Sequence, residues 1–154
     1  MKDNLFTPAT QQAILERIQQ LGPDTPRQWG KMSNSEVVCH MADPFRIVLN
    51  LRQTKPAVPR FLQPLLRMMV LTEKDWKPGT PTLRVFLQGE GGKGTPPTDF
   101  ESDKAALLLL VAEFCAKEPD YQFGRHPGIG QLTREQQGFM MWKHTDHHLR
   151  QFDL

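Results

Sequence analysis

The sequence lacks the features of a membrane protein or of a disulfide-stabilised protein. Its longest apolar run, 105–112, has eight residues, well short of the ~18 that suggest a bilayer span. Only two cysteines occur, Cys39 and Cys115, and their spacing matches no paired metal-binding motif, so reduced thiols in a cytoplasm are expected. The first eight residues contain no apolar segment, so no secretory signal is expected.

Concentrated charge is also missing. Nineteen Lys and Arg residues against 17 Asp and Glu residues give a net charge of +2, and the basic residues form no dense run. Nucleic-acid binding depends on clustered cations, so it is not expected here. What the sequence does have is the composition of a soluble globular chain, 38% hydrophobic and 23% charged. At 154 residues this predicts one domain, 1–154, with a single core.

Helix signals divide the chain into four long helices and one short helix. The long helices begin at Ser, Thr or Asp caps, and two of them have the Glu or Gln three residues later that completes a capping box. Apolar residues follow at helical spacing, which predicts helices over 8–21, 34–49, 99–118 and 134–152 and a shorter one over 59–71. This pattern predicts an all-α fold, an antiparallel four-helix bundle with an extra short helix and a long loop.

Two segments depart from regular helix. Pro44 falls inside the second predicted helix and either kinks it or restarts it with Asp43 as a cap; the apolar stripe continues in phase, which favours a kink. Residues 72–98 are rich in Pro, Gly and Thr and are predicted to be loop, although 83–87 has strand character without an evident partner. A loop of this length either covers or shapes a site or is a plain surface excursion.

Histidines on two different predicted helices form the main candidate site. His144 and His148 are four residues apart on the last helix, a separation of about 40° and ~6 Å that sets two imidazoles side by side. His40 lies in the apolar stripe of the second helix, and bundles build metal sites from facing helices. We predict that His40, His144 and His148 bind one divalent metal, with coordination positions left open for water or substrate. The alternative is a structural role in which hydrogen bonds satisfy the imidazoles.

Two neighbours of these histidines leave further assignments open. His147 can pair with His144 in place of His148, but it is less well aligned with the core face, so we expect it to face outward or to support the ligands. Asp43, three residues after His40, is the candidate catalytic residue, as orienter of a metal-bound water, general base or additional ligand. Its alternative role is to relieve the backbone beside Pro44.

Two other residues are assigned mainly structural roles. Cys39 is next to His40 and therefore about 100° away on the helix, so both cannot easily bind one ion, and a buried thiol is expected. His126, which precedes a proline, is expected to belong to a turn and could contact the mouth of the site.

Several blocks of the sequence resemble the DinB/YfiT-like family of metal-binding four-helix bundles. They occur in the family's order, they cover most of the chain outside its glycine-rich middle, and they comprise Trp29–Ser33, Cys39–Arg46, His126–Thr133 and Lys143–Phe152. In that family a histidine on the second helix and an H-x-x-x-H pair on the last helix bind a divalent metal, which maps onto His40, His144 and His148. The chain departs from the usual pattern at Ile129 and Gly130 and at Thr145, none of which is a proposed ligand.

The resemblance implies metal-dependent chemistry on a small molecule. Relatives include S-transferases that use low-molecular-weight thiols such as bacillithiol, mycothiol or glutathione, along with isomerases and hydrolases, and dimers are common among them. Nickel and zinc both suit imidazole ligands. The leading hypothesis is therefore a cytoplasmic Ni or Zn enzyme that activates a thiol or water for S-transfer or hydrolysis. A non-catalytic metal-binding protein of the stress response is the second hypothesis.

Overall fold

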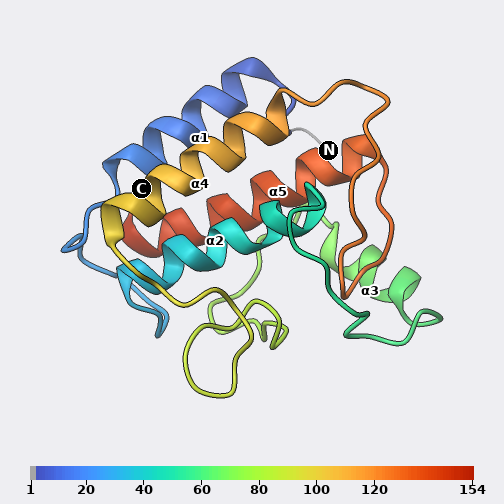
Figure 1. Ribbon diagram of the computed structural model, residues 1–154, viewed down its shortest axis with the longest axis horizontal. Helices are drawn as coiled ribbons and strands as arrows, with labels where there is room; N and C mark the ends of the chain where they lie inside the picture. The colour runs from blue at the N-terminus through green and yellow to red at the C-terminus, as the bar shows by residue number, and fades with distance from the viewer. Residues whose placement is uncertain (1–2) are drawn as a thin grey trace.

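The structure, a computed structural model, describes residues 3–154 and is all-helical (Figure 1). It contains α1 (Pro8–Gln20), α2 (Asn34–Val48), α3 (Gln63–Val70), α4 (Phe100–Cys115), α5 (Arg134–Leu149) and the short 3-10 helix η1 (Arg150–Phe152). Within the described range there is no β-strand, only an isolated bridge between His126 and Gly130. No helix among residues 3–154 has the length and apolar character needed to cross a membrane.

The four longer helices lie side by side, while α3 sits apart at one end of the group (Figure 1). Helix α2 packs against α4 and α5, and α1 packs against the same two helices. The main core lies between them and includes the fully buried Ile18, Phe45, Phe114 and Met141. A smaller apolar cluster around Ile129 connects the last helix to α3.

The predicted caps are present where three of the helices begin. Ser33 accepts from the backbone N–H of Glu36, whose side chain accepts from the backbone N–H of Ser33, and Thr133 and Gln136 repeat this arrangement at α5. Asp99 caps α4. These caps set where α2 and α5 begin, and hence the rotation at which each helix presents its histidines.

Two local predictions need adjustment, and one alternative left open by the sequence is decided. Helix α3 begins at residue 63 rather than 59, because residues 60–62 form turns, with a bond from Leu62 N to the Pro59 carbonyl. Residues 83–87 form successive turns instead of a strand, through a bond from Phe86 N to Leu83 O. Helix α2 continues through Pro44 without restarting, which is the alternative that the in-phase apolar stripe favoured.

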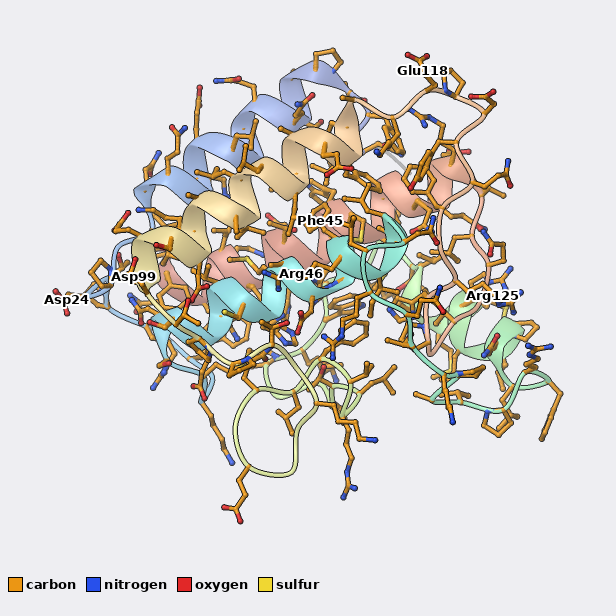
Figure 2. All side chains as sticks on the ribbon, in the orientation of Figure 1. Asp24, Phe45, Arg46, Asp99, Glu118 and Arg125 are labelled. Carbon is orange, nitrogen blue, oxygen red and sulfur yellow. The ribbon has the colours of Figure 1, made fainter. Side chains whose placement is uncertain are left out.

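Polar side chains connect α3 to the rest of the molecule. Arg125, labelled beside α3 in Figure 2, donates to Gln63 Oε1 at 3.3 Å. The buried Lys143 of α5 donates to the carbonyls of Val70 and Thr72 just where α3 ends. The end of α3 and the start of the 72–98 loop are therefore held against α5, next to the histidines.

Candidate metal centre

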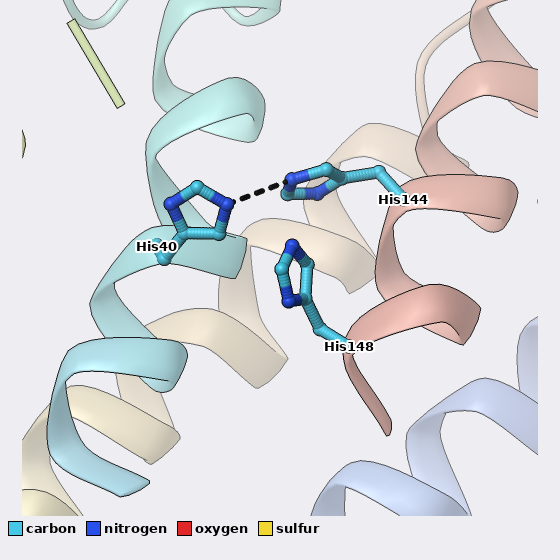
Figure 3. A group of neighbouring side chains, drawn as sticks. All are labelled: His40, His144 and His148. Carbon is cyan, nitrogen blue, oxygen red and sulfur yellow. Dashed lines mark hydrogen bonds between the residues drawn. The ribbon is translucent and has the colours of Figure 1, made fainter. Parts of the chain in front are cut away.

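His40, His144 and His148 come together in the interior between α2 and α5. Figure 3 shows the three rings turned toward one another, one from α2 and two from successive turns of α5. One nitrogen of each ring lies within 4.8 Å of a nitrogen of the other two, and all three residues are buried. They form a group that could hold a metal ion.

The proton on His40 is placed by the 72–98 loop. Nδ1 lies 2.6 Å from the Phe86 carbonyl oxygen and 3.3 Å from Gln88 Oε1. Both partners are acceptors, so Nδ1 carries the hydrogen and Nε2 keeps its lone pair. That Nε2 faces His144, at 3.2 Å from its Nε2. The sequence predicted that residues 72–98 either cover or shape a site or form a plain surface loop. In the structure this loop orients one of the three histidines.

Hydrogen bonds connect Asp43 to His40 through Gln88. Its carboxylate is fully buried and accepts from Gln88 Nε2 at 3.1 Å, which turns the amide oxygen of Gln88 toward His40. Thr95 donates twice to the same carboxylate, and Arg46 and Arg52 form ion pairs with it at 3.1 and 3.0 Å. The carboxylate is not part of the three-histidine group. In this geometry Asp43 holds the partner of a histidine in place.

His148 has an equivalent support from the C-terminal end of the chain. Its Nδ1 lies 3.0 Å from Gln151 Oε1, so Nδ1 carries the hydrogen and the lone pair is on Nε2. Gln151 fits beside Gly30, where a Cβ atom would lie only 2.8 Å from Gln151 Nε2. Gly30 also has a φ of +95°, a conformation that favours glycine. This accounts physically for the glycine in the Trp29–Ser33 block of the sequence.

His144 is the one member of the group whose second nitrogen lacks a partner. Its Nδ1 is buried and makes no hydrogen bond within the described part of the chain. Burial lowers the pKa of His144 well below its usual range, and the nearby His148 and His40 lower it further. Burial likewise lowers the pKa values of His40 and His148. All three imidazoles are therefore neutral at pH 7, the form that binds metals.

These residues fit a divalent metal in chemistry and in spacing. Two nitrogens bound tetrahedrally to one zinc ion at about 2.0–2.1 Å lie about 3.3 Å apart. The Nε2 atoms of His40 and His144 are 3.2 Å apart. Two of the three imidazoles donate their other N–H to an oxygen, as metal-bound histidines usually do. Three protein ligands leave at least one coordination position open.

His147 does not face outward, so that part of the sequence prediction is wrong. It is 7% exposed, and its ring packs at 4.9 Å from the Trp29 ring and 5.6 Å from the Trp76 ring. Both tryptophans come from loops that cover this face of α5. His147 is not in the three-histidine group, although its ring contacts that of His148.

Cys39 is buried, as expected, and remains a free thiol. Burial and the neighbouring Asp103 raise the pKa of its thiol to about 12. At neutral pH the sulfur is therefore protonated and a poor nucleophile.

Two cavities lie beside the histidines, on either side of Trp76. One, about 360 Å³ in volume, reaches His144 and has a mainly apolar wall that includes Pro44, Phe86 and Ile129. The other, about 460 Å³, reaches His147 and is more polar, with Asp75 and Arg150 in its wall. The apolar cavity therefore gives access to one of the three candidate ligands.

His126 lies in the wall of the apolar cavity, within the predicted turn. The sequence predicted that it belongs to a turn and left open a contact with the mouth of the site. Gln88 and Gln151, which orient two histidines, were not predicted. Neither belongs to a motif with metal-ligand spacing, and the contact of Gln88 depends on the path of an irregular loop.

The fold and site define an all-helical protein with a buried cluster of three histidines. The chain belongs to the family described as "Protein of unknown function (DUF1569)", whose model matches residues 2–153. No curated protein and no solved structure matches it.

Proposed function

We propose that the protein is a metal-dependent enzyme with a four-helix bundle of the DinB-like type. In this proposal His40, His144 and His148 hold one zinc or nickel ion. The site activates a thiol or water for S-transfer to, or hydrolysis of, a small molecule that enters through the apolar cavity.

The observation that carries the proposal is the convergence of three neutral imidazoles next to an accessible cavity. Hydrogen-bonded histidines without a metal would use both ring nitrogens, whereas here Nδ1 of His144 has no partner among residues 3–154. Leaving a buried polar atom unpaired costs about 1–3 kcal/mol, so this arrangement needs a compensating interaction. Metal coordination at Nε2 would add a favourable interaction at the other ring nitrogen of His144, while Nδ1 would carry the hydrogen and stay without a partner among these residues.

The chain's own residues perform positioning and exclude water. A dication bound to three neutral ligands keeps its full charge and lowers the pKa of a water or thiol in its open position. Gln88 and Phe86 hold His40 in the required tautomer, and Gln151 does the same for His148. The apolar wall beside His144 keeps the surroundings at low dielectric, which strengthens electrostatic effects there.

Metal content measured on matched variants tests the ligand set. The wild-type protein, stripped with a chelator and reloaded, should bind about one equivalent of zinc or nickel and gain thermal stability. His40→Ala, His144→Ala and His148→Ala should each lose that metal. His147→Ala is the control, because this neighbour is buried on the same helix but outside the group. If the three ligand variants still bound one equivalent of metal, the proposal would be contradicted.

A panel of reactions tests catalysis separately. The zinc- and nickel-loaded proteins are assayed with bacillithiol, mycothiol and glutathione against 1-chloro-2,4-dinitrobenzene, and with p-nitrophenyl acetate for hydrolysis. The expected result is turnover with at least one pair that disappears in His144→Ala. Turnover that survives removal of the metal would contradict the proposal.

A non-catalytic metal-binding protein of the stress response is the second candidate. One observation favours it: the nearest buried carboxylate, Asp43, is engaged by Gln88, Thr95 and two arginines and is outside the metal group. The Asp43 carboxylate is therefore not available at the site as a general base. This candidate predicts bound metal with no activity in the panel.

A further inference from the structure

His126 is held in one tautomer by the turn that it begins. Its Nδ1 accepts hydrogen bonds from the backbone N–H groups of Gly128 at 3.1 Å and Ile129 at 3.2 Å. The backbones of His126 and Gly130 also bond to each other in both directions, which closes the turn. Since Nδ1 is an acceptor, the hydrogen of the neutral ring is on Nε2. Burial lowers the pKa of His126 to about 4, so the ring is neutral at pH 7.

The Nε2–H group has no hydrogen-bond partner among the residues that the structure describes. The ring lines the apolar cavity that also reaches His144. The other polar side chains in this wall are His144 itself, Trp76, whose Nε1–H donates to the Val70 carbonyl, and Thr80 and Thr82, which are exposed. A fixed donor in a mainly apolar pocket is the kind of group that orients a ligand and determines specificity.

We propose that His126 donates from Nε2 to a hydrogen-bond acceptor on the small molecule bound in this cavity. The occupant is then uncharged and mainly apolar, with an acceptor such as a carbonyl oxygen. Among residues 3–154 no Lys, Arg, Asp or Glu lines the cavity, so a charged ligand would lose its hydration without gaining a counterion. The inference deepens the proposed function, on which it rests for the chemistry at the neighbouring metal, and it makes His126 a specificity-determining residue.

The substitution His126→Asn tests the Nε2–H donor by removing it while keeping the turn. An asparagine side-chain oxygen accepts from backbone N–H groups two residues on, as Nδ1 of His126 does, so the turn is retained. The shorter side chain does not reach the position of Nε2, and the donor to the cavity is lost. Thr82→Val is the matched control, because it removes a different polar group from the same wall. Thermal unfolding of each variant checks that the fold is intact.

The probes are two ligands of nearly equal shape, acetophenone and α-methylstyrene, of which only acetophenone has an acceptor. Their affinities are measured by NMR titration, on metal-free and on zinc-loaded protein. We expect the wild-type protein to prefer acetophenone by about three- to tenfold, the effect of one neutral hydrogen bond. In His126→Asn the preference should disappear through weaker acetophenone binding, while Thr82→Val should keep it.

The outcomes separate this inference from the proposed function. Equal affinities of the wild-type protein for the two ligands would overturn it. So would a preference that requires zinc and persists in His126→Asn, because the metal would then be the group that binds the carbonyl. A preference that depends on His126 in a protein that binds no metal would support the inference while the proposed function fails.

Discussion

Nε2 of His144 lies 3.2 Å from Nε2 of His40, although the two residues are 104 positions apart in the chain. Two neutral histidines with both lone pairs directed at this short gap repel each other. One must donate a hydrogen, or a cation must lie between them. His40 has its hydrogen on Nδ1, facing Phe86. The pair is therefore arranged either as donor and acceptor or as two ligands of one ion.

The support that Gln88 gives to His40 leads to a first prediction. Gln88→Ala should weaken zinc affinity by about tenfold, because partners of metal-bound histidines usually contribute about 10–100-fold. The effect should be smaller than that of His40→Ala, because the bond to the Phe86 carbonyl remains. Competitive titration with a chromophoric chelator measures it. Gln122→Ala, which removes an amide bonded only to Asp120, should leave the affinity unchanged.

Gly30 gives a second prediction through its contact with Gln151. Gly30→Ala should lower both zinc affinity and the free energy of unfolding, because the new Cβ displaces the amide that orients His148. The positive φ alone costs about 1–2 kcal/mol. Gly79→Ala is a control for that cost, because Gly79 has a φ of +79° and nothing within 4 Å of an added Cβ. Urea unfolding should show destabilisation in both variants, and only Gly30→Ala should lose zinc affinity.

His126 leads to a prediction about pH. Its pKa is about 4 in the folded protein, below the usual value of about 6.5 that applies to the unfolded chain. Between these two values the unfolded chain takes up the proton and the folded protein does not, so stability falls as the pH falls from about 6.5 toward 4. At pH 5 the loss from this residue is on the order of 2 kcal/mol.

The variant His126→Asn should remove that part of the acid sensitivity. Urea unfolding of the metal-free proteins at pH 7 and pH 5 gives the change for each. The variant should lose about 2 kcal/mol less than the wild-type protein over this interval. The same loss in both proteins would show that His126 titrates normally in the folded state.

Lys143 leads to a fourth prediction, about the cover of the cavity. Its ammonium donates to the Val70 and Thr72 carbonyls and lies 5.1 Å from the centre of the Trp76 ring. Lys143→Met should remove this partner from both carbonyls, leaving Val70 O with only the 3.4 Å bond from Trp76 Nε1, and should raise amide hydrogen exchange in residues 66–76. Lys104→Met, whose ammonium donates to Leu21 on another side of the protein, is the control and should not change exchange there.

The helices and the three histidines could be predicted because their signals are local. A cap at Ser33 and another at Thr133 set the helix starts, and a spacing of four residues sets His144 and His148 on one face. The position of His40 within an apolar stripe indicated burial, and its contact with α5 followed from the packing of helices against one another.

The error at His147 has a physical cause. Helical periodicity predicts on which face of α5 His147 lies. Whether that face is buried depends on what covers it. Trp29 and Trp76 cover it from two loops, and the path of a loop is set by tertiary contacts rather than by a repeating pattern. For the same reason the contact of Gln88 with His40 could not be predicted, because it depends on the path that residues 72–98 take back to α2.

The 72–98 loop contributes to two sites at once. Phe86 accepts from His40 with its carbonyl, while its side chain lines the cavity beside His144. A ligand that shifts Phe86 therefore also shifts the acceptor that holds His40. By thermodynamic linkage, any factor by which cavity occupancy changes metal affinity equals the factor by which metal changes affinity in the cavity. Phe86 would in this way couple an ion held by the three histidines to a small molecule in the cavity.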